Sequence, residues 1–394
     1  MNSTMTTNER KALLTACFIG FAYSANYTNH APLKDMLVAA FETSTFEFTK
    51  AKFGLLTTAI FLTHALMQIP GGHLADHFGP KKILIAALSV VVIGNFGIST
   101  STTYMALITW KFLIGFGTGT CFISGARYIY QNSKPERVLL NQGYYGACIL
   151  MGSGFVIFAV PLIAKHFNAW NYGFLATAIV ALLGLIAALF APQAEAKEHP
   201  QTSLKALLSH GPLYALGWVQ MASFGLVIVI GSWITTLLTE KSGIESKWLI
   251  HAVASLVLLI GIFSRSYGGN LVQRHGVKKV LVGSIFMNAT GCMLLAFLPE
   301  VFPVVLLAIV LLGLGCGFPY SALFSRATSL FPGRAGAAMG LVNMMGIVFI
   351  LCGAPLVGQL TDLSGNFTTA FLSLGLFALS SLFAIVKIPA TNQH

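Results

Sequence analysis

The sequence predicts an all-α polytopic membrane protein, with twelve transmembrane helices in two six-helix halves related by pseudo-symmetry. Three observations support this prediction: the composition, the spacing of apolar segments and an internal repeat. Of the 394 residues, 56% are hydrophobic and 9% are charged, whereas a soluble domain carries about 25% charged residues. A chain of this composition belongs in lipid, and its function is expected within the helix bundle.

Apolar segments of about 20 residues, the length that crosses a hydrocarbon core about 30 Å thick, recur along the whole chain. Their centres lie near residues 21, 62, 92, 115, 152, 181, 226, 258, 289, 314, 348 and 377. Segments spaced in this way leave short loops and no room for a folded soluble domain.

One segment of the chain is repeated. GGHLADHFGPKK begins at Gly71, and GGNLVQRHGVKK begins at Gly268, 197 residues later. A second repeat agrees with the first, because GFGTG begins at Gly115 and GLGCG at Gly313. We therefore expect two parallel halves, residues 1–190 and 212–394, related by an axis along the membrane normal. Residues 191–211 form one long polar linker between them.

Lysine and arginine are distributed unequally between the two sides of the membrane. Most of them fall in the loops that are internal if the N-terminus is cytoplasmic, and cytoplasmic loops carry this excess. Arg127 and Arg265 are counted among these loop residues. The expected location is the bacterial cytoplasmic (inner) membrane, with the linker and both termini in the cytoplasm. The net charge of +11 then reflects topology and anionic lipid, and no nucleic-acid partner is expected.

Polar residues inside the predicted spans mark a candidate solute cavity. Tyr23, Asn26, Tyr27 and His30 recur at helical spacing on one face of the first span. The full set assigned to the cavity is Tyr23, Asn26, Tyr27, His30, His64, Gln68, Lys111, Tyr144, Tyr145, Gln220, Tyr320 and Asn343. Each of them has an ordinary alternative, as a packing aromatic, an interfacial side chain or a hydrogen bond between helices.

Lys111 lies inside the fourth predicted span, about two turns from its outer end. A charge there costs roughly 2.5 to 3.5 kcal/mol on insertion scales unless it meets water or a partner. We expect Lys111 to face the water-filled path, with Gly115, Thr118 and Phe122 on the same face, and to serve solute capture or proton coupling. The alternative is a side chain that extends outward to the interface.

The acidic residues argue against a cationic solute. None of the twelve Asp and Glu residues falls in the middle of a predicted span, and a carrier of organic cations usually needs a buried carboxylate. Together with Lys111 and the histidines, this absence favours a small organic or inorganic anion or a zwitterionic metabolite.

The repeated segment has the features of a cytoplasmic latch. Gly71 and Gly72 would let a neighbouring helix approach closely, and Asp76 offers a carboxylate to helix N-termini or basic groups. A tight turn with a positive-inside anchor is the alternative, and it would account for the two lysines that follow. The gating residues expected from both copies are Gly72, Asp76, Gly79, Lys81, Lys82, Gly269, Arg274 and Gly276.

These residues resemble the signature of the major facilitator superfamily of secondary transporters. That signature runs Gly, any residue, Leu, Ala, Asp, a basic residue, any residue, Gly and then basic residues. Residues 72–82 follow it, with His77 in place of the usual Arg, while the second copy has Gln273 where an Asp might stand. The fourth helix of proton-coupled members often carries an Arg followed by three glycines at alternate positions, and residues 111–119 fit with Lys111 in place of that Arg.

The resemblance implies a monomeric secondary active transporter that moves a small polar solute by alternating access, with H+ as the coupling ion and without a cofactor. Uptake carriers for organic anions, nitrate or cyanate are similar in outline, but the Arg in helix 2 that marks nitrate carriers is missing here. Two alternatives stay open: multidrug or toxic-compound efflux by proton antiport, and a non-transporting substrate sensor on a transporter scaffold.

An enzyme is not expected. The sequence has no HExxH motif and no Gly-rich phosphate loop followed by Lys and Ser or Thr. The six cysteines fall in predicted spans without CxxC or Cys/His metal spacing, so no metal site is expected either.

Overall fold

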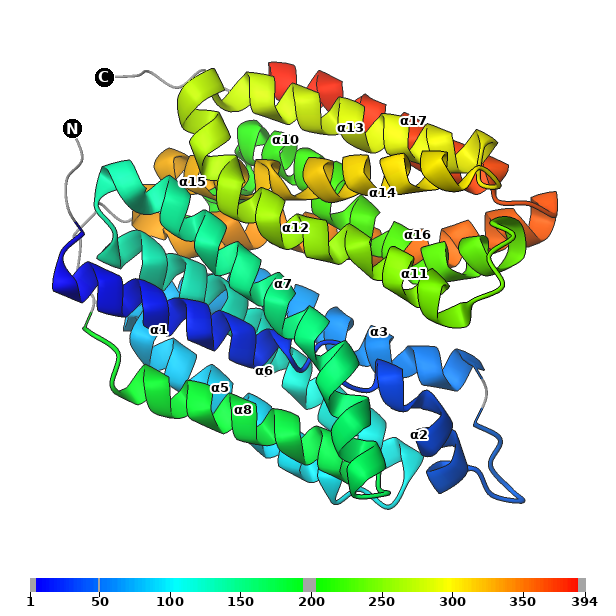
Figure 1. Ribbon diagram of the computed structural model, residues 1–394. Coiled ribbons are helices and arrows are strands. Elements are labelled where there is room, and N and C mark those ends of the chain that lie inside the picture. The colour runs from blue at the N-terminus through cyan, green and yellow to red at the C-terminus, as the bar shows by residue number, and fades with distance from the viewer. Residues whose placement is uncertain (1–4, 49, 194–202, 389–394) are drawn as a thin grey trace. The chain divides into compact units, whose positions relative to one another are not determined.

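Helices make up nearly all of the structure, a computed structural model that describes residues 5–48, 50–193 and 203–388 (Figure 1). Within these residues, strand pairing is limited to one bridge between Thr43 and Phe46. The predicted all-α class is therefore confirmed. Residues 194–202 of the predicted linker, like the extreme ends of the chain, lie outside the described residues.

The chain divides into two compact units, of which unit 1 comprises Met1–Asn141, Cys148–Gln201 and Pro332–Gly340. Its elements are α1 (Thr7–Ser24), η1 (Ala31–Leu33), α2 (Lys34–Phe41), α3 (Lys50–Leu66), α4 (Gln68–Phe78), α5 (Pro80–Ser99), α6 (Tyr104–Asn132), most of α7 (Pro135–His166), α8 (Asn171–Leu189), η3 (Pro332–Arg334) and the start of α16 (Ala335–Ser364). Helix α6 is central in this unit, because α1, α3, α4 and α5 all pack against it, and α8 covers α1 and α5.

Unit 2 comprises Gln142–Ala147, Thr202–Phe331 and Leu341–His394. Its elements are α9 (Leu204–Leu208), α10 (Gly211–Gln220), η2 (Met221–Gly225), α11 (Leu226–Lys241), α12 (Lys247–His275), α13 (Val277–Phe297), α14 (Phe302–Gly317), α15 (Pro319–Leu330), the remainder of α16 and α17 (Thr368–Val386). Helix α13 packs against α14 and α17, and α12 packs against α14 and α11.

Most of the predicted spans are continuous helices. Among the described residues, ten helices are long and apolar enough to cross a membrane, and the bent pair α3–α4 would make an eleventh. Helix α1 falls short because its 18 residues include Glu9, Arg10 and Lys11 and it ends at Ser24. The apolar run predicted around residue 21 is thus interrupted, with residues 25–30 forming non-helical turns.

Two further helical segments are irregular. Helices α3 and α4 meet at an angle of 45°, where Pro70 lacks the N–H that would bond to Leu66 and its ring crowds that carbonyl group. Between α10 and α11, the chain forms a π-helix, η2, without leaving the helical path. Such π segments are often found at functional sites.

The two copies of the repeated segment form the same kind of hairpin. Gly79 joins α4 to α5 with φ 89°, and Gly276 joins α12 to α13 with φ 82°. A positive φ is costly for residues with a side chain, so the glycine that stands at this position in both repeats is required by the turn.

The structure corrects the assignment of Arg127 and Arg265 to inner loops. Both are buried, with 3% and 2% of their surface exposed, and they lie inside α6 and α12. These helices each have 29 residues, and both arginines lie within them and not in the loops that follow. Two cations expected in the cytoplasm therefore belong to the helix bundle.

Candidate substrate site and gate

Lys111 lies on α6 and bonds to the non-helical segment that follows α1. Its Nζ donates to Oδ1 of Asn29 over 2.6 Å and lies 3.4 Å from the carbonyl oxygen of Asn26. The side chain is 1% exposed, so it does not extend outward to the interface. Within the described residues, no carboxylate pairs with Lys111. Lys111 is thus a buried cation held by neutral oxygen atoms.

Asn29 connects Lys111 to two other helices of unit 1. Its Nδ2 donates to Oδ1 of Asn95 on α5 over 3.1 Å and to Oγ1 of Thr177 on α8 over 2.8 Å. All three side chains are buried. The network satisfies the polar groups without adding negative charge, so it leaves the positive charge of Lys111 uncompensated.

Aromatic and histidine side chains form a second cluster in unit 1. The ring of His64 lies 5.3 Å from that of Tyr27, and its Nδ1 lies 3.1 Å from Oγ1 of Thr118. Tyr23 is 5.9 Å from Tyr27, and Nε2 of Gln68 donates to the carbonyl oxygen of His64 over 3.0 Å. Four predicted cavity residues are therefore neighbours.

The other two predicted cavity residues of the first span, Asn26 and His30, have separate partners. Asn26 donates from Nδ2 to the carbonyl oxygen of Ala22 over 2.9 Å. His30 lies beyond the end of α1, with Nε2 2.8 Å from Oγ1 of Thr57 on α3. Both side chains are buried. The side chain of Asn26 thus bonds to the first helix itself, and that of His30 joins the segment after this helix to α3.

Arg265 is the buried cation of unit 2. Its guanidinium donates from Nη1 to the carbonyl oxygen of Gly146 over 3.0 Å, and its Cζ lies 4.4 Å from the ring of Tyr320 and 5.3 Å from that of Phe224. Within the described residues, no carboxylate pairs with Arg265 and its Nε has no hydrogen-bond partner. A buried guanidinium with an unused donor is suited to bind an anion.

The remaining predicted cavity residues also belong to unit 2. Gln220 donates from Nε2 to Oδ1 of Asn343 over 3.2 Å. Tyr145 is buried, whereas Tyr144 is 41% exposed. Tyr320 is the predicted residue that lies next to Arg265, and the structure brings Phe224 of η2 to the same guanidinium.

Asp76 lies at the N-terminus of α16, within unit 1. Its Oδ1 accepts the N–H of Gly336 over 3.1 Å, and its Oδ2 accepts that of Ala337 over 3.3 Å. Nε of Arg127 lies 2.9 Å from Oδ1. Unpaired N–H groups and the helix dipole make a helix N-terminus attractive to a carboxylate, and Arg127 adds an opposite charge.

The backbone around this carboxylate is closely packed. A Cβ atom on Gly72 would collide with the carbonyl group of Gly336, so α4 and α16 can meet here only because both residues are glycine. Nη1 of Arg334 lies 2.8 Å from Nδ1 of His73. Lys81 donates to the carbonyl oxygen of Ala191 over 2.6 Å.

The other predicted gating residues show fewer contacts. Lys82 and Arg274 are exposed, and Gly269 is buried on α12. Gln273, which stands where the second copy lacks an Asp, is exposed. The carboxylate contact is thus a property of the first repeat.

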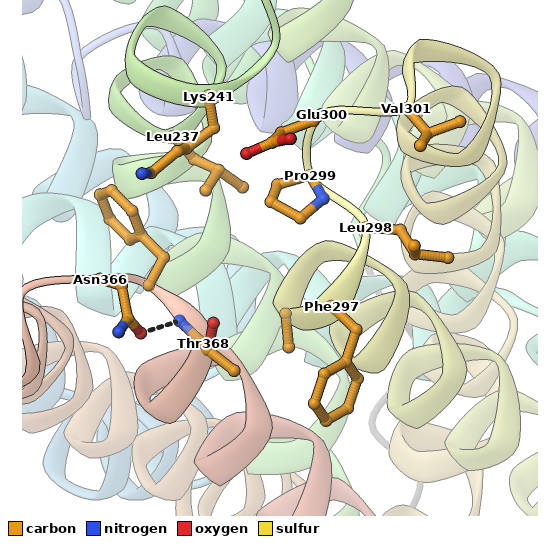
Figure 2. A pocket seen from close by; sticks show the side chains of 11 residues that line it. Leu237, Lys241, Phe297, Leu298, Pro299, Glu300, Val301, Asn366 and Thr368 are labelled. Carbon is orange, nitrogen blue, oxygen red and sulfur yellow. Dashed lines mark hydrogen bonds between the residues drawn. The ribbon is translucent and has the colours of Figure 1, made fainter.

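A pocket of about 260 Å³ lies in unit 2 near the ends of α11, α13 and α17 (Figure 2). Lys241 and Glu300 line it, and Oδ1 of Asn366 accepts the N–H of Thr368 beside it over 3.0 Å. None of the predicted site residues lines this pocket. Among the described residues, no group of three or more His, Cys, Asp or Glu side chains is placed to hold a metal ion.

Residues 16–266 and 246–393 match the sequence profile of the Major Facilitator Superfamily. This chain belongs to the Major Facilitator Superfamily. Its members are transporters, so family membership confirms a multi-pass membrane transporter and excludes an enzyme.

Curated relatives of this superfamily member are similar at low identity over most of the chain. The nitrite extrusion protein of Bacillus subtilis is 23% identical over 86% of this chain and 85% of its own length. The 2-nitroimidazole transporter of Escherichia coli is 26% identical over 98% of both chains. A probable nitrate transporter of Staphylococcus haemolyticus, NarT, is 25% identical over 80% of this chain and 81% of its own length.

Solved structures of the superfamily share the fold. The Escherichia coli fucose:proton symporter FucP has a TM-score of 0.78 at 16% identity, covering 98% of this chain and 100% of that chain. The human organic anion transporter MFSD10 has a TM-score of 0.80 at 15% identity, covering 96% of this chain and 100% of that chain. The predicted superfamily fold is therefore confirmed.

Sequence reasoning missed Arg265 as a site residue of this superfamily member, although the repeat contained a signal. Gly268 follows Arg265 by three residues, as Gly71 follows Gln68. Gln68 was assigned to the cavity, so the repeat relates Arg265 to a predicted site residue. Asn95 and Thr177 carry no comparable signal, since each is one uncharged polar residue in an apolar segment. Asn29 stands among other polar residues, and the one-face spacing of Tyr23, Asn26, Tyr27 and His30 does not include it.

Proposed function

We propose that this transporter moves a small oxyanion, of the size of nitrite or nitrate, across the cytoplasmic membrane of a bacterium by alternating access. Arg265 carries the proposal, because its guanidinium is buried inside a helix with an unused Nε donor and no carboxylate partner in the described residues. An incoming oxyanion would supply the negative charge that Arg265 lacks and an acceptor for its Nε. The relatives named for nitrite and nitrate support this class of solute.

Tyr320 and Phe224 restrict what can approach Arg265. Their rings lie 4.4 Å and 5.3 Å from Cζ, and aromatic faces stabilise a guanidinium while they exclude water. We propose that a planar anion that accepts from Nε of Arg265 fits between these rings better than a bulky one. The site therefore favours a flat oxyanion over a large organic anion.

Lys111 has a different part in the proposal. Its Nζ is already bound to Asn29. We therefore propose that Lys111 attracts the anion from a distance and does not make the first direct contact with it. Because charges in a low-dielectric interior are poorly screened, a buried ammonium without a counterion raises the positive potential around it. The aromatic cluster of Tyr27 and His64 remains a proposed part of the cavity wall.

Alternating access would use two six-helix halves, residues 1–190 and 212–394, connected by the linker 191–211. Asp76 is the proposed latch: its bonds to Gly336, Ala337 and Arg127 exist in one conformation and would break in the other. We place the linker and both termini in the cytoplasm, and we expect a monomer.

Proton coupling follows for uptake from the charge of the solute. Moving one negative charge into a cell with a negative interior costs about 2.3 kcal/mol per 100 mV, and a co-transported proton cancels that charge. Export of the same anion needs no such ion, so coupling to H+ is proposed for the uptake direction.

A second candidate is efflux of a neutral nitroaromatic compound, which the relative named as a 2-nitroimidazole transporter favours. Thermal unfolding of the purified protein separates the two candidates, because a ligand that binds the folded state raises its stability. We expect nitrite or nitrate to raise the unfolding temperature of the wild type. Stabilisation by 2-nitroimidazole and not by either anion would select the second candidate.

Substitutions of Arg265 test whether the anion binds at this residue. A hydrogen bond to a charged group contributes about 1.5–3 kcal/mol, so Arg265→Gln should weaken anion binding about 10- to 100-fold. Arg265→Lys should recover part of it, since it keeps the charge but loses the fork of donors. Lys278→Gln, at an exposed position of α13, is the control. Equal anion binding by Arg265→Gln and the wild type would overturn the proposal.

A further inference from the structure

We infer that Asn288 is a positioning residue for the anion site: its amide holds the π-helix η2 that presents Phe224 to Arg265. The inference rests on the proposed function of Arg265 and deepens it. Asn288 lies on α13, outside every contact made by the guanidinium. It is fully buried, and its Nδ2 donates to the carbonyl oxygen of Ala222 over 3.0 Å.

The hydrogen bonds of η2 show what this amide replaces. In an α-helix the N–H of Leu226 would bond to the carbonyl oxygen of Ala222, four residues earlier. Here the N–H of Leu226 bonds to Met221, five residues earlier, and to Ser223. The carbonyl of Ala222 therefore does not receive the N–H that it would accept in an α-helix, and the side chain of Asn288 donates to it instead.

Loss of the hydrogen bond between Asn288 and Ala222 would be costly, because both groups are buried. Ala222 and Asn288 are both 0% exposed, so without the amide the Ala222 carbonyl would lose a hydrogen bond in a place that water does not reach. Such a loss is destabilising, and we infer that the chain would respond by opening the wide turn or returning to α-helical bonding. Either change alters the direction of the side chains on that turn.

One of those side chains belongs to the proposed anion site. Phe224 lies within η2, with its ring 5.3 Å from Cζ of Arg265. A π turn accommodates one more residue than an α turn, and each residue of a helix rotates the following ones by about 100°. The width of this turn therefore decides whether Phe224 covers the guanidinium.

Helix α14 makes room for the amide. A Cβ atom on Gly315 would collide with Oδ1 of Asn288, so a glycine is needed for Asn288 to reach Ala222. This contact provides a way to disturb the amide without changing Asn288 itself.

The corresponding place in unit 1 is also interrupted. Gly268 follows Gly71 by 197 residues, and the same offset relates η2 to the end of α1 and the non-helical residues after it. There Asn95 accepts a hydrogen bond from Asn29. Asn95 lies on the third long helix of unit 1, as Asn288 lies on the third long helix of unit 2. In each unit, an asparagine of the third long helix thus supports an interruption beside a buried cation.

The test compares Asn288→Leu, which has a similar shape and no donor, with Gly315→Ala. Ser284→Ala is the control, because Ser284 is buried on the same helix and its Oγ donates to the carbonyl oxygen of Val280, one turn earlier in that helix. Hydrogen exchange of residues 217–230 is measured without ligand, and nitrite and nitrate are titrated separately for affinity, KM and kcat.

We expect both test variants to exchange faster at residues 221–226 and to bind the anion at least fivefold more weakly. KM should rise by a similar factor while kcat stays within about twofold, which a general loss of folded protein would not produce. Ser284→Ala should match the wild type.

Two results would overturn the inference while leaving the proposed function intact. One is unchanged exchange at residues 221–226 in Asn288→Leu. The other is altered exchange with unchanged affinity for an anion whose binding depends on Arg265. If the wild type binds neither anion through Arg265, the proposed function itself has failed, and the positioning role of Asn288 fails with it.

Discussion

The ammonium group of Lys111 lies 2.6 Å from Oδ1 of Asn29, in a buried network that contains no carboxylate among the described residues. The contact joins the charge on α6 to the point where the first helix is interrupted. A cation in this position is stable only while neutral oxygen atoms replace the water it has lost.

This dependence predicts coupling between the two side chains. Asn29→Leu should lower the free energy of unfolding by about 3 kcal/mol, because it leaves a buried ammonium without its main acceptor. In a Lys111→Met background the same change should cost about 1–3 kcal/mol less. A double-mutant cycle of unfolding measures this difference, and additivity to within about 0.5 kcal/mol would show that the pair does not interact.

Asp76→Asn should slow transport while leaving solute affinity and folding nearly unchanged. The amide keeps the shape of the carboxylate but loses the charge that Arg127 and the N-terminus of α16 attract. We expect at least a fivefold fall in flux across the whole substrate range, measured in proteoliposomes. Transport at the wild-type rate would exclude the latch.

Gly72→Ala should inhibit transport more strongly than an alanine elsewhere in the same bent pair of helices. The new Cβ would collide with the carbonyl group of Gly336, so the close contact of α4 with α16 could not form. Gly54→Ala is the matched control, since nothing lies within 4 Å of a Cβ there. Equal flux in the two variants would show that this contact is dispensable.

The orientation of the chain is testable by labelling single cysteines in intact cells. Cysteine at the exposed Lys82 should react with a membrane-impermeant reagent only after the cells are opened, because the hairpin is predicted to be cytoplasmic. Cysteine at Glu245, exposed between α11 and α12, should react from outside. The reverse pattern would overturn the orientation derived from the basic residues.

The sequence was sufficient for the fold because the apolar segments and the repeat are long-range patterns that need no knowledge of packing. Gly79 and Gly276 stand at the same place in both copies of the repeat, and both have the positive φ that a turn there requires. Asp76 was identified from its signature, although the signature does not say that its partners are Gly336 and Ala337.

The buried polar contacts could not be predicted from the sequence, and the reason is physical. Asn29 and Thr177 are 148 residues apart, and nothing in either neighbourhood specifies that their helices meet. Arg265 was missed because it lies near the inner end of the span predicted around residue 258, where a basic residue was assigned to the inner side of the membrane. The role inferred for Asn288 depends on its contact with Ala222 in the π-helix, and Asn288 lies 66 residues from Ala222 in the sequence.

Anion exchange in proteoliposomes tests most directly whether a small oxyanion crosses the membrane through the site at Arg265. Vesicles loaded with unlabelled nitrite and diluted into isotopically labelled nitrite should accumulate label through the wild-type protein, with nitrate as a competitor. Arg265→Gln should reduce this exchange at least tenfold, while Lys278→Gln should not. Accumulation no greater than in protein-free vesicles for nitrite and for nitrate, or full exchange by Arg265→Gln, would contradict the proposed anion transport.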